Sequence, residues 1–455
     1  MENTCAGDIA RAAGGKLLRG DKDQIIKNVS IDSRSMNGQD LFVPLIGERT
    51  DAHDYIGQAM ENGAVAVLTS RDMEPFGDAA WIKVNDTLQA LKDIGTDYRR
   101  GLDIRVVGVT GSVGKTTTRE MTAAALGAGY RVFKTHKNLN SNIGLPLTLT
   151  QISRADEIAV LEMGISDFGE MEELSYMAMP HTAIITNIGS AHLAAFGTRD
   201  NTFREKFRIT QSMAPGGTII LNGDDEYLKT VGPECGLERI FFGLGPGCDI
   251  TAADIEFTRE GTEFTAVYGS ERARVTLPVT GRHMVMNALA ALAAARVHGI
   301  DMEAAAEALA GFKGFKNRQQ ILTLNGCTII DDTYNASPDS MKAALTVLAG
   351  TDTAGSKAAV LADMLELGAC EAELHREVGE FAAGLGLDAL ICVGGLAAHI
   401  AEGYSRQNGT GKVYSFATKQ EALPAVRDYA KEGNALLFKG SNGMRMGELI
   451  KALSE

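Results

Sequence analysis

The 455-residue chain is poor in proline, cysteine and aromatic residues. Its cysteines are scattered without a CxxC pair at Cys5, Cys235, Cys248, Cys327, Cys370 and Cys392. Neither a disulfide framework nor a zinc site is therefore expected. The sequence also lacks a run of about 18 apolar residues and a basic start followed by an apolar segment, so we expect neither a membrane span nor an export signal. A protein of the reducing cytoplasm fits these absences.

Basic residues are in deficit as well. The chain has 44 Lys and Arg against 58 Asp and Glu, a net charge of −14, which opposes general nucleic-acid binding because phosphate neutralisation needs a basic surface. Any anionic ligand must meet a local basic pocket. Glycine is in excess at 51 residues, which indicates tight turns or sites lined by backbone. At about 150 residues per domain, the length indicates roughly three domains.

Apolar runs alternate with stretches of helical spacing in the middle third of the chain. The candidate strands are 104–109, 158–163, 182–188 and 218–222, with helices expected over 117–126 and 201–213. This alternation predicts a parallel sheet with helices on both faces. Residues 249–279 differ, because ADIEFTREGTEFTAVYG indicates two strands joined at a Glu-Gly turn, and we expect an antiparallel margin there.

The last third repeats the alternating pattern in CTIIDD, KAAVLADM, ALICVGG, KVYSF and ALLFKGS, which predicts a second open α/β domain. The glycines and lysines of GFKGFK, residues 311–316, mark the join. The first hundred residues are mixed, with strands expected at 29–31, 41–43 and 64–68. We therefore expect an α/β fold of three domains: a mixed domain over 1–103, a parallel-sheet domain over 104–313 and a Rossmann-like domain over 314–455.

The sharpest motif is the glycine-rich segment IRVVGVTGSVGKTTT at residues 104–118, where a strand, a loop and a helix follow one another. Such a loop points backbone N–H groups at a phosphate, Lys115 can reach the terminal phosphates, and Thr116 can ligate Mg²⁺. Val109 stands where the strict pattern has its first glycine, so a glycine-rich turn with an incidental lysine is the alternative. The predicted nucleotide-binding residues are Gly111, Ser112, Val113, Gly114, Lys115, Thr116 and Thr117.

Polar side chains follow several of the expected strands. Glu162 follows IAVL, Asn187 follows AIIT with His192 five residues later, and Asp331 and Asp332 follow TII. Open parallel sheets bind ligands at the carboxyl ends of their strands, and Mg²⁺ prefers oxygen ligands, although histidine is a less typical one. Each residue alone is more often a cap or a loop residue. Their joint placement favours a metal and phosphate site.

Two further features have competing explanations. Asn138, Asn140 and Asn142 alternate along one loop, which suits either ligand contacts or ordinary turn chemistry. Lys206 lies among apolar residues in the expected helix NTFREKFRITQSM. Apolar surroundings lower the pKa of a lysine, and a neutral amine can react with CO₂, but a lysine that snorkels to the surface is the usual alternative.

Together these motifs resemble the Mur ligases, ATP-dependent enzymes of peptidoglycan precursor synthesis. The matching segments, in family order, are TGSVGKTTT, NLNSNIGLP, LEMG, TNIGSAH, GRHMVMNALAA, DDTYNASPDS, LADMLELG and KGSNGMRM. The last third is most similar to the member that joins D-alanyl-D-alanine to UDP-N-acetylmuramoyl-tripeptide, and SIDSR with GQDLFVPLIGERTDAHDYI is similar to the segment that holds the uridine nucleotide. There is no DNPR-like segment, the mark of the diaminopimelate- or lysine-adding relative.

The resemblance implies ATP and Mg²⁺ as cofactors and these two small molecules as substrates. We expect a monomer with no nucleic-acid or membrane partner. The resemblance implies catalytic roles for Lys115, Lys206, His192 and Arg318. It implies Mg²⁺ contacts for Thr116, Glu162, His192 and a carbamylated Lys206, and further ATP contacts for Asn287, Arg318, Asp332 and Tyr334. The substrate contacts expected are Ser33, Arg34, Asn138, Asn140, Asn142, Asn187, Ser337, Asp363 and Lys439.

The chain departs from the family pattern at four positions. Met284 replaces Asn in GxHN, Ser337 replaces the second Asn of NANP, Ala362 replaces the Gly before Asp363, and Arg208 stands where a Glu commonly follows the modified lysine. The rival functions are another amide ligase, either the diaminopimelate- or lysine-adding one or folylpolyglutamate synthase, and a P-loop regulatory module. A GTPase should carry an NKxD-like segment, which is absent. The sequence leaves open whether the accepted peptide carries lysine or diaminopimelate at its third position.

Overall fold

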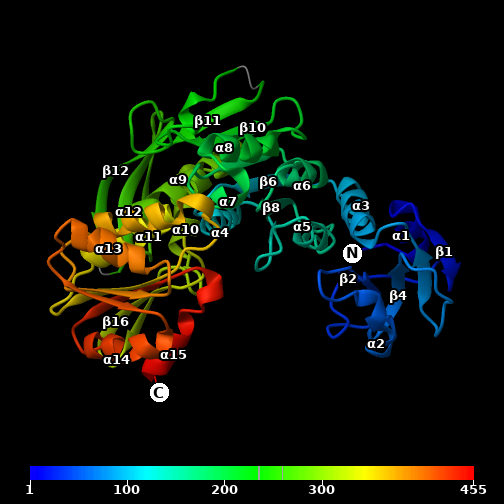
Figure 1. Cartoon of the computed structure of the whole chain (residues 1–455). Coiled ribbons are helices and arrows are strands. Elements are labelled where there is room, and N and C mark those ends of the chain that lie inside the picture. Colours follow the sequence, from blue (N-terminus) through cyan, green and yellow to red (C-terminus); the bar gives the residue numbers. More distant parts are fainter. Residues whose placement is uncertain (234–235, 259, 455) are drawn as a thin grey trace.

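The chain folds around three separate sheets that follow one another along the sequence (Figure 1). A computed structural model describes residues 1–233, 236–258 and 260–454, so Cys235, and Arg259 in the expected hairpin, lie outside the described residues. The three sheets have five, nine and six strands in chain order, and parallel pairs dominate each of them. The expected α/β fold of three parts is confirmed.

The N-terminal sheet has the strand order β1-β5-β4-β3-β2, in which β1 pairs antiparallel and the other pairs are parallel. Its elements are α1 (Ala6–Ala12), β1 (Lys16–Arg19), β2 (Asn28–Ser30), β3 (Asp40–Phe42), α2 (Ile56–Glu61), β4 (Ala64–Thr69), β5 (Ala80–Lys83) and α3 (Thr87–Arg100). The Asp86 carboxylate accepts the N–H groups of Leu88 and Gln89, which starts α3. This helix leads into the central sheet (Figure 1).

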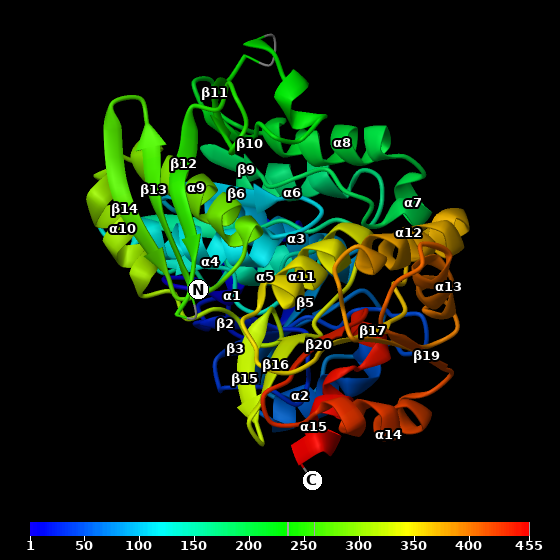
Figure 2. The same cartoon turned by 90° about the vertical axis from the view of Figure 1, so that its left-hand side faces the viewer.

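The central sheet has the order β14-β13-β12-β11-β10-β9-β6-β8-β7. Its strands are β6 (Arg105–Thr110), β7 (Val132–Lys134), β8 (Ile158–Glu162), β9 (Thr182–Ile185), β10 (Thr218–Asn222), β11 (Glu238–Phe242), β12 (Ile250–Phe257), β13 (Thr262–Tyr268) and β14 (Glu271–Leu277). The antiparallel margin is confirmed, but it has a third strand, β14, which the sequence analysis missed (Figure 2). In β14, exposed charged residues alternate with buried ones, as on an edge strand packed on one face.

The central helices are α4 (Lys115–Leu126), α5 (Gly144–Leu149), α6 (Glu170–Ala178), α7 (Leu193–Phe196), α8 (Arg199–Phe207), α9 (Arg282–Val297) and α10 (Met302–Ala310). The helix expected over 201–213 is wrong in its second half, because α8 ends at Phe207 and a 3₁₀ turn follows. There the Thr210 hydroxyl donates to the carbonyl of Phe207, 2.8 Å away, and this side-chain bond competes with a further helical turn.

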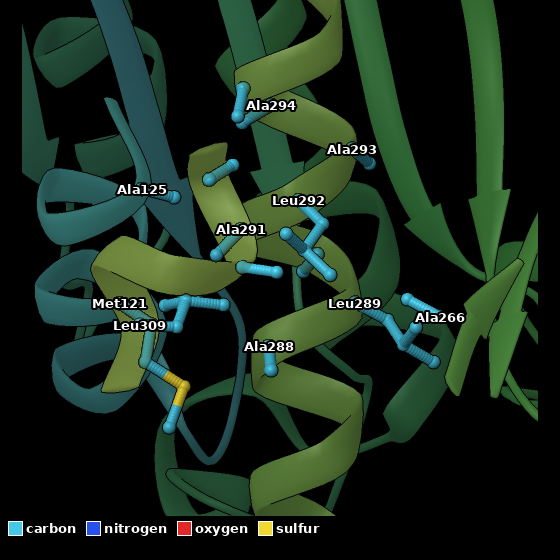
Figure 3. Close-up of a cluster of buried hydrophobic side chains, with 14 of the residues drawn as sticks. Met121, Ala125, Ala266, Ala288, Leu289, Ala291, Leu292, Ala293, Ala294 and Leu309 are labelled. Carbon is cyan, nitrogen blue, oxygen red and sulfur yellow. The ribbon is translucent and has the colours of Figure 1, made fainter. Parts of the chain in front are cut away.

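A close-packed alanine-rich core fixes the helix that follows the glycine-rich loop. Met121 and Ala125 of α4 pack with Ala288 and Leu292 of α9 and with Leu309 of α10 (Figure 3). Small side chains let these helices approach closely, and a close-packed core resists movement. The start of α4 is therefore held rigidly beneath its loop.

The C-terminal sheet has the order β15-β16-β20-β17-β18-β19, with β15 antiparallel and the rest parallel. Its elements are β15 (Gln320–Leu324), β16 (Cys327–Asp332), α11 (Pro338–Gly350), β17 (Lys357–Ala362), α12 (Glu371–Ala383), β18 (Ala389–Val393), α13 (Ala398–Arg406), β19 (Lys412–Phe416), α14 (Lys419–Tyr429), β20 (Ala435–Lys439) and α15 (Gly447–Ser454). The five strands expected here are present, and β15 is an addition. Within the described ranges, no helix is both long and apolar enough to cross a membrane.

A buried histidine at the end of α9 makes the stability of the fold depend on pH. The His298 Nε2 lies 3.2 Å from the hydroxyl of Thr182 on β9, and burial, reinforced by Arg105 and His181, lowers the pKa of His298 to about 4. The unfolded chain binds this proton near pH 6.5, so acid favours unfolding. Between about pH 6.5 and about pH 4, we expect the free energy of unfolding to fall by about 3 kcal/mol through this residue.

Denaturant titrations across this pH range test the expectation. His298→Gln keeps a polar group for Thr182 and has no proton to take up, so its free energy of unfolding should change less with pH than that of the wild type. Equal pH dependence in the two proteins would show that His298 does not carry the effect.

Candidate functional site

A cavity of about 560 Å³ lies between the central and C-terminal sheets. The central sheet contributes the last residues of β8, β10 and β11 and the loops that follow β6, β7, β8 and β9, and α9 contributes its first turns. The C-terminal domain contributes the segment before β15, the loop after β16 and the end of β20. The cavity thus lies at the carboxyl ends of parallel strands, where open α/β sheets bind ligands.

Most of the predicted site residues line this cavity. They are Ser112, Val113, Gly114, Lys115, Thr116, Thr117, Asn138, Asn140, Glu162, Asn187, His192, Asn287, Arg318, Asp332, Tyr334, Ser337 and Lys439. Six predicted residues are not part of the described lining, namely Ser33, Arg34, Gly111, Asn142, Lys206 and Asp363.

The glycine-rich loop requires glycine at two positions. Gly111 has φ +144° and a Cβ there would lie 1.9 Å from the Thr186 hydroxyl oxygen. Gly114 has φ +88° and a Cβ there would lie 3.0 Å from the Asn287 Oδ1. Any other residue would meet backbone strain at both positions, together with a steric clash at Gly111 and a tight contact at Gly114. The loop therefore keeps its backbone open toward the cavity, with α4 beginning at Lys115.

The amine of Lys115 is held by the loop itself. Its Nζ donates to the carbonyl of Gly111 at 2.8 Å and to that of Ser112 at 3.4 Å. Burial lowers the pKa of Lys115, Glu162 opposes this shift, and Arg318 reinforces it. Lys115 and Arg318 thus place two cationic groups, from different domains, on one cavity that suits a polyphosphate.

Asn187, in the loop that follows β9, holds the glycine-rich loop in place. Its Oδ1 accepts the N–H of Val113 at 2.9 Å, and its Nδ2 donates to the Val113 carbonyl at 2.9 Å. The Thr186 hydroxyl also donates to that carbonyl, at 2.6 Å. The side chain predicted to contact substrate is therefore engaged with the phosphate loop.

A buried carboxylate lies beside the first turn of α4. Glu162 is 3% exposed, and its Oε1 accepts hydrogen bonds from the Asn140 Nδ2 at 2.7 Å and the Thr116 hydroxyl at 3.3 Å. Within the described chain no group of three His, Cys, Asp or Glu side chains could hold a metal alone. Mg²⁺ usually binds through one or two carboxylates together with water and substrate phosphates, so Thr116 and Glu162 fit this ion.

Lys206 on α8 is fully buried, so the snorkelling alternative is wrong. Among the described residues its Nζ has no hydrogen-bond partner. Burial and the nearby Lys115 move the pKa of Lys206 well below its usual value, while Glu205 opposes the shift. Burial of an unpaired amine favours its uncharged form, which is the form that reacts with CO₂. Lys206 therefore fits a modified lysine.

His192 connects the central domain with the C-terminal domain. Its Nδ1 lies 2.8 Å from the Glu366 Oε2, and both residues have left-handed backbones. Burial, Lys115 and Lys206 lower the pKa of His192, while Glu366 raises it. A neutral imidazole whose Nδ1 bears the proton for Glu366 has its other nitrogen available as a ligand.

The C-terminal wall of the cavity is held by its own contacts. The guanidinium carbon of Arg318 lies 4.0 Å from the centre of the Tyr334 ring, a cation–π contact. The buried Lys439 Nζ pairs with the Asp332 Oδ2 at 2.6 Å and donates to the Asn335 carbonyl at 2.9 Å. Ser337 caps α11.

Four of the predicted residues outside the cavity lining differ in their surroundings. The Ser33 hydroxyl donates to the Gln58 Oε1 at 2.7 Å, and the Arg34 guanidinium pairs with Asp32 at 2.8 Å, both in the N-terminal domain, which stands apart in Figure 1. The Asp363 Oδ1 accepts the N–H of Ala397 at 2.6 Å. Asn142 has a buried Oδ1 without a hydrogen-bond partner among the described residues.

Three charged residues around the site, Asp339, Glu366 and Arg119, carry no local sequence pattern that marked them individually as functional. The Asp339 Oδ2 accepts the N–H of Ser190 at 3.1 Å, and the Glu366 carbonyl accepts the N–H of Ala194 at 3.2 Å, so both tie the C-terminal domain to the loop of His192. Arg119 pairs with Glu162. Arg119 could have been found, because it follows Lys115 by four residues and so shares its face of the helix. The two acidic residues make contacts between domains, and no motif in their own segments indicates these contacts.

Family profiles match all three parts of the chain. The profile described as Mur ligase family, catalytic domain, matches residues 25–99, the Mur ligase middle domain matches 109–295, and the Mur ligase, glutamate ligase domain, matches 317–442. The chain is 40% identical to UDP-N-acetylmuramoyl-tripeptide–D-alanyl-D-alanine ligase of Bacillus subtilis over 98% of each protein. It is 34% identical to the enzyme of that name from Escherichia coli over 95% of each.

Solved structures agree with this relationship. MurF from Acinetobacter baumannii superimposes with a TM-score of 0.91 at 33% identity, covering 99% of this chain and 98% of that one. MurF ligase from Thermotoga maritima, solved in complex with ADP, gives a TM-score of 0.84 at 29% identity over 95% of this chain and 98% of that one. Identity at this level over nearly the whole length identifies the chain as a member of the Mur ligase family.

Proposed function

We propose that the chain is an ATP-dependent ligase that joins D-alanyl-D-alanine to UDP-N-acetylmuramoyl-tripeptide, giving the pentapeptide, ADP and phosphate. The observation that carries this is the cavity in which Lys115 of the glycine-rich loop and Arg318 of the C-terminal domain meet. Relatives that bear the name of this ligase match the chain along nearly its whole length, which supports the same substrates here.

Joining a carboxylate to an amine requires activation, because the carboxylate oxygen is a poor leaving group. The terminal carboxylate of the tripeptide attacks the γ-phosphate of ATP and displaces ADP. The amine of the dipeptide then attacks the resulting acyl phosphate, loses a proton and displaces phosphate. Little covalent chemistry falls to the protein, so its residues act by positioning and charge neutralisation. In this proposal Lys115 and Arg318 hold the phosphates from opposite walls.

Thr116 and Glu162 are the residues proposed to hold one Mg²⁺ together with the phosphates. His192 and a carbamylated Lys206 are proposed to hold a second Mg²⁺. When bound, Mg²⁺ neutralises the charge that develops on the transferred phosphoryl group. The remaining work belongs to the chain: Asn187 keeps the loop open, and Glu366 and Asp339 tie the His192 loop to the C-terminal domain. A closed junction excludes water that would hydrolyse the acyl phosphate.

Each domain has a proposed part in this reaction. Residues 1–103 bind the uridine nucleotide, with Ser33 and Arg34 as contacts, residues 104–313 bind ATP, and residues 314–455 bring D-alanyl-D-alanine. Asn287, Asp332 and Tyr334 are proposed contacts of the nucleotide, and Asn138, Asn140, Ser337, Asp363 and Lys439 of the other substrates. The enzyme is proposed to act as a cytoplasmic monomer.

Phosphate release tests the proposed acceptor. With ATP, Mg²⁺ and UDP-N-acetylmuramoyl-tripeptide present, we expect phosphate release to accelerate at least tenfold when D-alanyl-D-alanine is added, because its amine consumes the acyl phosphate. Tenfold corresponds to about 1.4 kcal/mol in the barrier. The mass spectrum should show a pentapeptide product. Parallel reactions should use UDP-linked dipeptide with lysine or diaminopimelate, and folate with glutamate. Turnover confined to one of these, or nucleotide binding without ligation, would contradict the proposal.

A further inference from the structure

Arg119 is a buried charged residue to which the proposed mechanism gives no part. It lies on α4 one turn after Lys115, and its side chain is 1% exposed. A guanidinium removed from water in this way must be paired and hydrogen-bonded. Its partners therefore show which groups it holds in place.

The guanidinium of Arg119 is held on two sides. Its Nη1 donates to the Glu162 Oε2 at 3.0 Å and to the Lys137 carbonyl at 3.1 Å. Its Nη2 donates to the Glu120 Oε1 at 2.6 Å, and the other oxygen of Glu120 is paired with Lys134. Because it is planar and bound to two carboxylates and one carbonyl, the guanidinium is fixed in a single orientation.

The same contacts divide the two oxygens of Glu162 between different neighbours. The Oε2 faces Arg119, while the Oε1 faces the Asn140 amide and the Thr116 hydroxyl. Thr116, Asn140 and Glu162 all line the cavity, and Arg119 is not among the described lining residues. Arg119 therefore contacts the carboxylate from behind.

We propose that Arg119 is a positioning residue that aims the Oε1 of Glu162 at the Mg²⁺ accompanying ATP. This inference rests on the proposed function, because it assumes a nucleotide in the cavity. The centre of the Phe315 ring lies 6.0 Å from the guanidinium carbon, in the segment that joins the central and C-terminal domains. Arg119 thus links the carboxylate, the Asn-rich loop and the domain junction through one side chain.

The removal of Arg119 should change Mg²⁺ binding in opposite directions, depending on whether Arg119 acts through its charge or by orienting Glu162. A cation beside a metal site repels Mg²⁺, so its loss should tighten metal binding if charge were its only contribution. If Arg119 orients Glu162, its loss frees the carboxylate to turn toward Lys115, and metal binding should weaken. Outer groups that orient metal ligands are worth about 10-fold to 100-fold in metal affinity.

Calorimetric binding of a non-hydrolysable ATP analogue distinguishes the two. The measured quantity is the ratio of its affinity in excess Mg²⁺ to its affinity in EDTA. For Arg119→Met we expect this ratio to fall about tenfold, with the affinity in EDTA unchanged. Arg119→Lys retains a donor for Glu162, so its ratio should recover most of the way to that of the wild type. Arg99→Met is the matched control, because Arg99 is also buried but donates to the carbonyls of Ala178, Leu102 and Ile104. Its melting temperature should fall while its ratio stays that of the wild type.

An Arg119→Met ratio equal to or above that of the wild type overturns the inference. If this variant does not fold, Arg119→Gln provides the test, because it keeps one amide donor without the charge. Its affinity ratio is expected to fall about fivefold, and an unchanged ratio overturns the proposal. A wild-type protein that does not bind the analogue at all overturns the proposed function itself, which separates the two failures.

Discussion

Lys115→Ala is expected to lower kcat/KM for ligation by about a thousandfold while the protein stays folded. The Nζ of Lys115 is held by the carbonyls of Gly111 and Ser112 at the start of α4, so its charge is already placed where phosphates enter. Loss of a preorganised group that stabilises transition-state charge costs about 10²-fold to 10³-fold in rate. A thousandfold corresponds to about 4 kcal/mol in the barrier. Steady-state ligation rates at saturating dipeptide measure the change in kcat/KM. Thermal melts show whether the variant stays folded.

The matched control for this variant is Lys92→Ala. Lys92 lies on α3 and pairs with Glu173 at 2.6 Å, and it is not a described residue of the cavity wall. It should leave kcat/KM unchanged. If Lys115→Ala ligates at the wild-type rate, the glycine-rich loop does not bind the reacting phosphates, and the proposed function loses its main support.

The sequence predicted the fold well where strands are buried on both faces. The run CTIIDD coincides with β16 residue for residue, and the apolar part of the expected run ALICVGG forms β18, which is buried along its whole length. KVYSF also coincides with a strand, β19, although this edge strand is partly exposed. β14 and β15 escaped because edge strands alternate charged or polar residues with apolar ones over a short length, and such short patterns fit several local structures. The helix expected over 201–213 is present only in its first half, because a threonine hydroxyl competes for a backbone carbonyl after Phe207, which apolar periodicity does not detect.

The site could be predicted where one local segment contains the whole signal. The glycine-rich loop is such a segment, because the glycines, the lysine and the helix start are contiguous. The partners of each side chain could not be predicted in the same way. Asn187 braces Val113 across 74 residues, and Glu366 of the C-terminal domain meets His192 of the central domain. Contacts of this kind depend on how the sheets and domains pack, and no pattern within one segment contains them.

Lys206→Met should lower ligation by about a thousandfold without lowering the melting temperature. Methionine matches lysine in length and removes a buried amine that has no hydrogen-bond partner among the described residues, so the fold loses no bond. In the proposed function, the neutral amine of the wild type attacks CO₂ and releases a proton, which gives an anionic carbamate. Without it, the site lacks a negative group opposite Lys115, and the loss of rate follows from lost positioning and charge.

Carbon-13 NMR with labelled bicarbonate tests the modification directly. A carbamate signal should appear in the wild-type protein and in Lys92→Met, and it should be absent from Lys206→Met. Removal of CO₂ should slow ligation by the wild type and leave the residual rate of Lys206→Met unchanged. A wild-type protein without the signal, but with full activity in CO₂-free buffer, would mean that Lys206 acts as an unmodified amine. Full activity in Lys206→Met would mean that this residue has no part in the reaction, because a methionine cannot provide either group.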